Sequence, residues 1–139
     1  MSTPAEATEK LDRLATEMGQ LGDKLARVER DLEPVDAEFV RFVDDFELGL
    51  YARSISEDGF KLPSEALRQK LAIQAMPPEL YGRRTALVRS RDRLVQRIRT
   101  LKVEVEAQRS ILSALKEEAS ASGSYSGRRF DNVTPERAR

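Results

Sequence analysis

Apolar residues recur at steps of three and four along two long stretches of this chain. The first stretch runs from Leu11 to Phe46 and keeps this spacing without a gap. An apolar residue about every 3.5 positions forms a narrow seam along one side of a helix, and a second helix must cover it. We therefore predict a long helix here, with a seam that is rich in Leu at first and ends in Phe39, Phe42 and Phe46.

A second seam follows from Leu80 to Leu115, with Arg84, Arg91 and Gln108 at some of its positions. Polar residues at isolated seam positions fix the register and the number of helices in a coiled coil. We expect the two seams to form the core of the protein or the interface of an oligomer. The residues expected there are Leu25, Val28, Leu32, Phe39, Phe42, Phe46, Leu87, Leu94, Ile98, Leu101, Val105 and Leu112.

The segment between the seams contains the residues that break helices. Pro34 is expected to kink the first helix or to start a new one, and the unbroken phase of the seam favours a kink. Asp58-Gly59 predicts a turn, and Ser64 can cap a short helix over residues 65–75. Met76-Pro77-Pro78 ends that helix, because a residue before proline avoids the α conformation.

These elements predict an all-α protein, built as a long antiparallel helical hairpin or coiled coil with a short helix at the bend. The hairpin is expected over residues 1–119, with one arm at 5–55, the bend at 56–78 and the other arm at 79–119. Residues 120–139 are rich in Ser and Gly and then mixed polar, with no helical period. They are expected to form a flexible tail.

Charge is distributed unequally between the arms. Residues 29–58 hold ten acidic and three basic residues, whereas residues 83–102 hold eight basic residues and one acidic residue. With a bend near residue 67, the acidic residues from Asp36 to Glu47 are expected opposite the stretch from Arg89 to Arg99. Exposed ion pairs contribute about 0–1 kcal/mol each, so the seams must supply most of the stability.

Composition excludes several classes of chemistry. The 139 residues include no Cys and no His, which excludes disulfides, thiol nucleophiles, imidazole bases and the usual zinc sites. Nucleotide-binding and hydrolase motifs are also missing. We expect a protein that is not an enzyme and that uses no cofactor or metal.

The chain has no apolar run long enough to span a membrane and no signal-peptide pattern at its start. We expect a soluble cytoplasmic protein without a membrane partner, in the host cytoplasm if it is encoded by a phage. A two-helix hairpin leaves the apolar flanks Val88, Val95, Val103 and Ile111 partly open. A homo-oligomer is therefore expected, because a second copy can bury these flanks.

A nucleic-acid partner is the alternative. Arg89, Arg93 and Arg97 repeat along the second arm and suit phosphate groups, unless the acidic arm neutralises them. In the tail, Arg128 and Arg129 lie between the aromatic residues Tyr125 and Phe130. Proteins that bind single strands combine cations and aromatic residues in this way. An ordinary disordered tail or a docking peptide for a protein partner remains open.

Two segments, FELGLYARSISEDGFKLPSEALRQKLA (46–72) and RSILSALKEE (109–118), carry a resemblance. Within residues 36–118 they resemble small helical accessory proteins of bacteriophages, among them the UvsY-like recombination mediators. The resemblance implies oligomerisation, binding of single-stranded DNA and loading of a recombinase, and it assigns no residue a role. The first hypothesis is thus a self-associating coiled-coil scaffold, and the alternative is a single-stranded nucleic-acid-binding recombination accessory protein.

Overall fold

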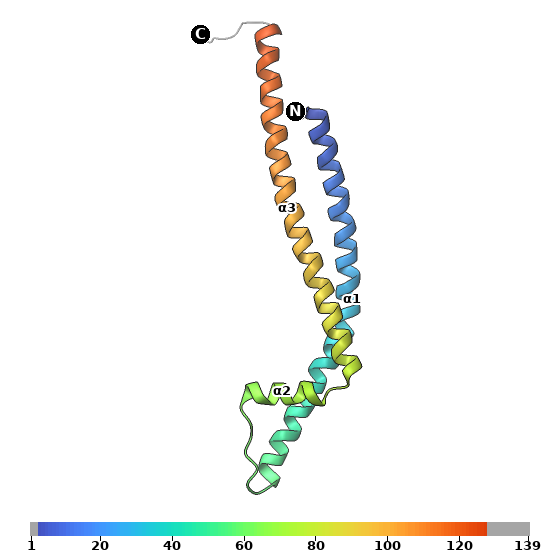
Figure 1. The fold of residues 1–139 in the computed structure, drawn as a ribbon, viewed down its shortest axis with the longest axis vertical. Helices are drawn as coiled ribbons and strands as arrows, with labels where there is room; N and C mark the ends of the chain where they lie inside the picture. The colour runs from blue at the N-terminus through green and yellow to red at the C-terminus, as the bar shows by residue number, and fades with distance from the viewer. Residues whose placement is uncertain (1–2, 128–139) are drawn as a thin grey trace. The chain divides into compact units, whose positions relative to one another are not determined.

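The computed structural model describes residues 3–127, and every regular element in that range is an α-helix. Helix α1 spans Pro4–Ser56, α2 spans Glu65–Ala75 and α3 spans Pro78–Gly127 (Figure 1). The predicted plan of two long helices joined through a short one is confirmed, and the first helix ends within a residue of the predicted position.

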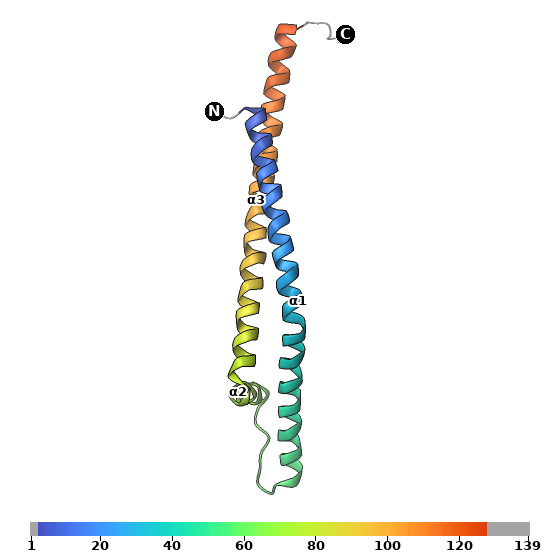
Figure 2. The same ribbon diagram turned by 90° about the vertical axis from the view of Figure 1, so that its right-hand side faces the viewer.

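The chain divides into two compact units. The central unit comprises Gly22–Gln96, which includes most of α1, all of α2 and the beginning of α3. The end unit combines Met1–Leu21 with Arg97–Arg139. Within each unit the described parts of α1 and α3 lie side by side and run antiparallel (Figures 1 and 2). The predicted antiparallel pairing of the long helices is therefore confirmed inside each unit.

Side-chain caps satisfy backbone N–H groups at the starts of α1 and α2, and the cap at Ser64 is the predicted one. At the start of α1, the backbone N–H of Glu6 donates to Thr3 Oγ1 at 3.2 Å, and the backbone N–H of Thr3 donates to Glu6 Oε1 at 2.8 Å. This reciprocal pair is a capping box. Ser64 Oγ accepts from the backbone N–H of Leu67 at the start of α2, and Pro78 opens α3.

Pro34 lies inside α1, which continues through it as a single assigned helix. A proline here removes the hydrogen bond to the carbonyl of Arg30. Both residues are exposed, so water can hydrate that carbonyl. The alternative that a second helix starts at Pro34 is therefore wrong.

The register in which α1 pairs with the rest of the chain differs from the prediction. Asp36 pairs with Arg84, Glu38 with Arg83 and Glu47 with Arg68, instead of with the stretch from Arg89 to Arg99. The reason is the asymmetry of the bend. Residue Glu47 of α1 contacts α2, so the last part of α1 packs against α2, and α3 begins opposite an earlier part of α1.

The predicted boundary of the tail at residue 120 is also wrong, because α3 continues to Gly127. Ser and Ala cost a helix little, and no proline interrupts residues 120–127. Their composition resembles a linker, but it holds no signal strong enough to stop a helix that is already formed. Residues 128–139 lie outside the described part of the chain.

The described part of the chain has a small core. In the central unit, the buried apolar residues are Leu32, Leu50, Ala72, Met76 and Leu80, and in the end unit they are Ala7 and Leu101. Four of these lie in the last turns of α1, in α2 and its C-cap, and at the start of α3, where three segments meet in the central unit (Figure 1). Elsewhere two helices alone cover each other, and few side chains become fully buried.

Candidate functional site

The predicted seam is covered only in part by the chain itself. Of its twelve residues, Leu32 and Leu101 are buried, with exposed fractions of 6% and 0%. The other ten are half-buried: Leu25, Val28, Phe39, Phe42, Phe46, Leu87, Leu94, Ile98, Val105 and Leu112. Full burial of a large apolar side chain contributes about 1.5–3 kcal/mol. Most of that free energy is already gained within the chain, and a smaller part remains to be gained along the seam.

The phenylalanines of the first seam lie in the central unit. The rings of Phe42 and Phe46 stack, with centroids 6.4 Å apart and planes inclined at 20°. The guanidinium of Arg84 lies 4.1 Å from the centroid of the Phe39 ring and donates from Nε to Asp36 Oδ1 at 2.7 Å. Arg84, a polar residue at a seam position, thus fixes α3 against α1 through an ion pair and a cation–π contact.

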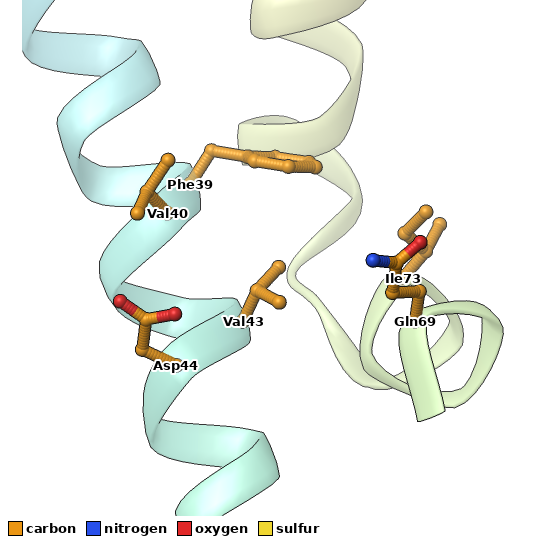
Figure 3. A pocket seen from close by; sticks show the side chains of 6 residues that line it. All are labelled: Phe39, Val40, Val43, Asp44, Gln69 and Ile73. Atoms are coloured by element: carbon orange, nitrogen blue, oxygen red, sulfur yellow. The ribbon is translucent and has the colours of Figure 1, made fainter. Parts of the chain in front are cut away.

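An apolar groove lies between α1 and α2. It has a volume of about 270 Å³ and is lined by Phe39, Val40, Val43, Asp44, Gln69 and Ile73. Phe39 and Val43 project from α1 toward α2 and the start of α3, and Ile73 and Gln69 belong to the facing helix (Figure 3). Asp44 is exposed at the groove and forms no ion pair with any described residue. The groove offers apolar contact and one free carboxylate.

Two rows of exposed apolar residues lie outside the seam. One row is on α1, where Leu48 and Ile55 are 65% and 87% exposed. The other is on α3, where Val103 and Ile111 are 66% and 42% exposed. The sequence predicted open flanks at Val103 and Ile111, but it missed Leu48 and Ile55. The signal was present as a second line of apolar residues at steps of three and four, Leu48, Tyr51 and Ile55, beside a more regular seam.

Some of the arginines are paired across the helices. Arg97 Nη2 donates to Glu17 Oε2 at 2.8 Å in the end unit, and this hydrogen bond raises the pKa of Arg97. Arg97 was one of the three cations expected to contact nucleic acid, but it forms an ion pair with Glu17 of the same chain. Arg89 and Arg93 are exposed and form no ion pair within residues 3–127.

A second groove, of about 440 Å³, lies between α1 and α3 in the central unit. Half-buried Val28 and Leu94 line it together with Ser90. Its charged lining residues are Lys24, Arg27, Arg93 and Asp31. None of its three cations pairs with a carboxylate of the described chain. This groove brings Arg93 together with two cations of α1 that the sequence did not single out.

The remaining candidates lie at the end of the chain. The backbone of Tyr125 belongs to α3, but its side chain lies outside the described residues, as do Arg128, Arg129 and Phe130. Within the described range, no group of three or more acidic residues is arranged to hold a metal ion. A search of the same residues finds no helix long and apolar enough to cross a membrane.

Comparison with known proteins gives no assignment. No family model matches the chain, and neither the curated proteins nor the solved structures contain a match. The features that indicate a function are the half-covered seam, the exposed rows and the two grooves.

Proposed function

We propose that this protein is a non-enzymatic, coiled-coil scaffold that self-associates and presents its helices to other proteins. The main support is the half-buried seam, in which ten of twelve residues are incompletely covered by the chain's own helices. A long helical pair with a small core gains stability when a second copy covers the remaining apolar surface. The exposed rows on α1 and α3 add further apolar area.

The seam is tested by Phe42→Asp, which places a charge beside the stacked ring of Phe46. We expect the variant to lose its assembly or its helical structure, because an unpaired carboxylate is costly in apolar surroundings. Sedimentation velocity and far-UV circular dichroism measure the two effects. Ala37→Asp, at an exposed position of the same helix, is the matched control and should change neither. An unchanged, fully helical assembly of Phe42→Asp would contradict the proposal.

A second candidate function is binding of single-stranded nucleic acid, in line with the resemblance to phage recombination mediators. The observation that favours it is the groove with three cations, Lys24, Arg27 and Arg93, that have no carboxylate partner among residues 3–127. Three cations and one carboxylate, Asp31, line the groove and leave it with a net positive charge, which phosphate groups can offset. The hydroxyl of Ser90 can donate to a phosphate oxygen.

Salt dependence tests this second function. Affinity for a single-stranded oligonucleotide should fall as the salt concentration rises. The logarithm of the association constant should fall with the logarithm of the salt concentration, with a slope of about 0.7 for each phosphate contact. Arg93→Ala should weaken binding and reduce this slope. Arg83→Ala is the control, because Arg83 lies near Glu38 at 3.8 Å and outside the groove. Deletion of residues 128–139 measures how much this part of the chain contributes to the affinity for the oligonucleotide. Absence of binding at about 50 mM salt would remove this candidate.

A further inference from the structure

Two exposed rows on different helices of this chain match in the spacing of their first three residues and carry opposite charges. The α1 row consists of Asp44, Leu48, Ala52 and Ile55, and all four are exposed. The α3 row consists of Arg99, Val103, Ala107 and Ile111, and all four are exposed. The first three residues of each row are four positions apart, so each row follows one side of its helix.

We infer that the α1 row of one copy binds the α3 row of a second copy, with the two helices parallel. This inference rests on the proposed self-association and names its surface. In the parallel orientation Asp44 lies beside Arg99, Leu48 beside Val103 and Ala52 beside Ala107. Each apolar residue then meets an apolar residue, and each charge meets its opposite.

Charge decides between this pairing and the alternatives. Neither Asp44 nor Arg99 forms an ion pair within the described chain, so each charge is free to pair with a partner. Two α1 rows in parallel would place Asp44 against Asp44, and two α3 rows would place Arg99 against Arg99. Like charges in contact are unfavourable. Antiparallel pairing of the unlike rows would place both charges against apolar residues at opposite ends.

The partner is a second copy because the two rows are complementary in charge and neither Asp44 nor Arg99 forms an ion pair within the described chain. Each copy carries one row of each kind. In a two-fold dimer, residue i of one copy contacts residue j of the other and the reverse contact also forms.

Cross-linking tests the inference directly, because the chain has no Cys of its own. Leu48→Cys and Val103→Cys are made in separate chains, unfolded, mixed, refolded together and oxidised. We expect a covalent dimer in the mixture and little in either variant alone, since a disulfide requires close Cβ atoms. Leu48→Cys mixed with Arg109→Cys is the control, because Arg109 lies on another side of α3.

Direction and charge are tested separately. Ile55→Cys should cross-link with Ile111→Cys and not with Arg99→Cys; the reverse result would overturn the parallel orientation.

Asp44→Arg and Arg99→Asp should each weaken self-association a few-fold, and together they should restore it. An unmodified chain that is oligomeric, combined with no cross-link between Leu48→Cys and Val103→Cys, overturns this surface alone. A monomeric unmodified chain overturns the proposed self-association with it.

Discussion

Gly59 adopts a φ of +83° in the turn that follows α1. Side chains other than hydrogen disfavour this region of backbone conformation. A Cβ atom at this position would meet no heavy atom of the described chain within 4 Å, so the cost of a substitution is conformational. The sequence predicted a turn at Asp58-Gly59 because Gly after Asp is a common turn signal.

Gly59→Ala should therefore lower the free energy of unfolding by about 1 kcal/mol. Gly49→Ala is its counterpart, because Gly49 lies inside α1 and an added Cβ there also meets nothing within 4 Å. Alanine favours a helix over glycine by up to about 1 kcal/mol, so this change should be stabilising. Urea unfolding measures the free energy of unfolding of both variants. Effects of the same sign would contradict the role of the positive φ.

Arg53 and Glu57 form a local ion pair in the same turn. Arg53 Nε and Nη2 donate to the two carboxylate oxygens of Glu57 at 2.9 and 3.2 Å, and the guanidinium lies 4.3 Å from the centroid of the Phe60 ring. These hydrogen bonds lower the pKa of Glu57. Any stability from this pair is present above the ordinary pKa of a carboxylate and is lost as pH falls through the lowered pKa in the folded protein.

Arg53→Gln should raise the pKa of Glu57 toward its ordinary value, because the charged donor is removed. Titration of the Glu57 carboxyl carbon by NMR measures this change. Arg41→Gln is the control, because Arg41 is exposed on the same helix and forms no ion pair in the described chain, so its replacement should leave the pKa of Glu57 lowered. A Glu57 titration that is unaffected by Arg53→Gln would show that the pair does not persist in solution.

Among the elements, α2 is attached to α1 through the side chain of Arg68. Arg68 Nε donates to Glu47 Oε2 at 3.0 Å, and Arg68 Nη1 donates to the backbone carbonyl of Pro63 at 2.8 Å. The same guanidinium lies 5.4 Å from the centroid of the Tyr51 ring. One residue of α2 thus contacts α1 twice and also holds the segment that leads into α2.

Arg68→Ala should destabilise the attachment of α2 by about 1–3 kcal/mol, because it removes two charge-assisted hydrogen bonds. Hydrogen exchange of the α2 amides is the measurement, since local opening of this helix exposes them. Lys70→Ala is the control, because Lys70 is exposed on the same helix and makes no ion pair in the described range. Equal exchange in the two variants would contradict this account of α2.

The elements themselves were predictable to different degrees. The start of α2 follows from local chemistry, because Ser64 caps it as the sequence predicted. The end of α3 was missed because residues 120–127 lack a strong stop signal. The register was missed because it depends on how the last turns of α1 pack against α2. That packing includes the contact between Glu47 and Arg68, which no local pattern in the sequence reveals.

At the scale of the whole molecule, the sequence identified the seam but not the extent to which the chain covers it. Periodicity shows which residues share a side of a helix, whereas coverage depends on how many other helices pack there. The charge counts predicted that the acidic arm neutralises the arginines. The contacts in the structure show that only some of the arginines are paired with a carboxylate. Arg84 and Arg97 are paired, whereas Arg89 and Arg93 have no partner among residues 3–127.

The central claim is that a second copy completes the seam, so that folding and association are coupled. A coupled assembly becomes more stable as its concentration rises, because mass action favours the bound, folded form. The most direct test is the midpoint of thermal unfolding of the unmodified chain, followed by circular dichroism over about a hundredfold range of concentration. The midpoint should rise with concentration. A single cooperative transition with the same midpoint at every concentration would contradict it.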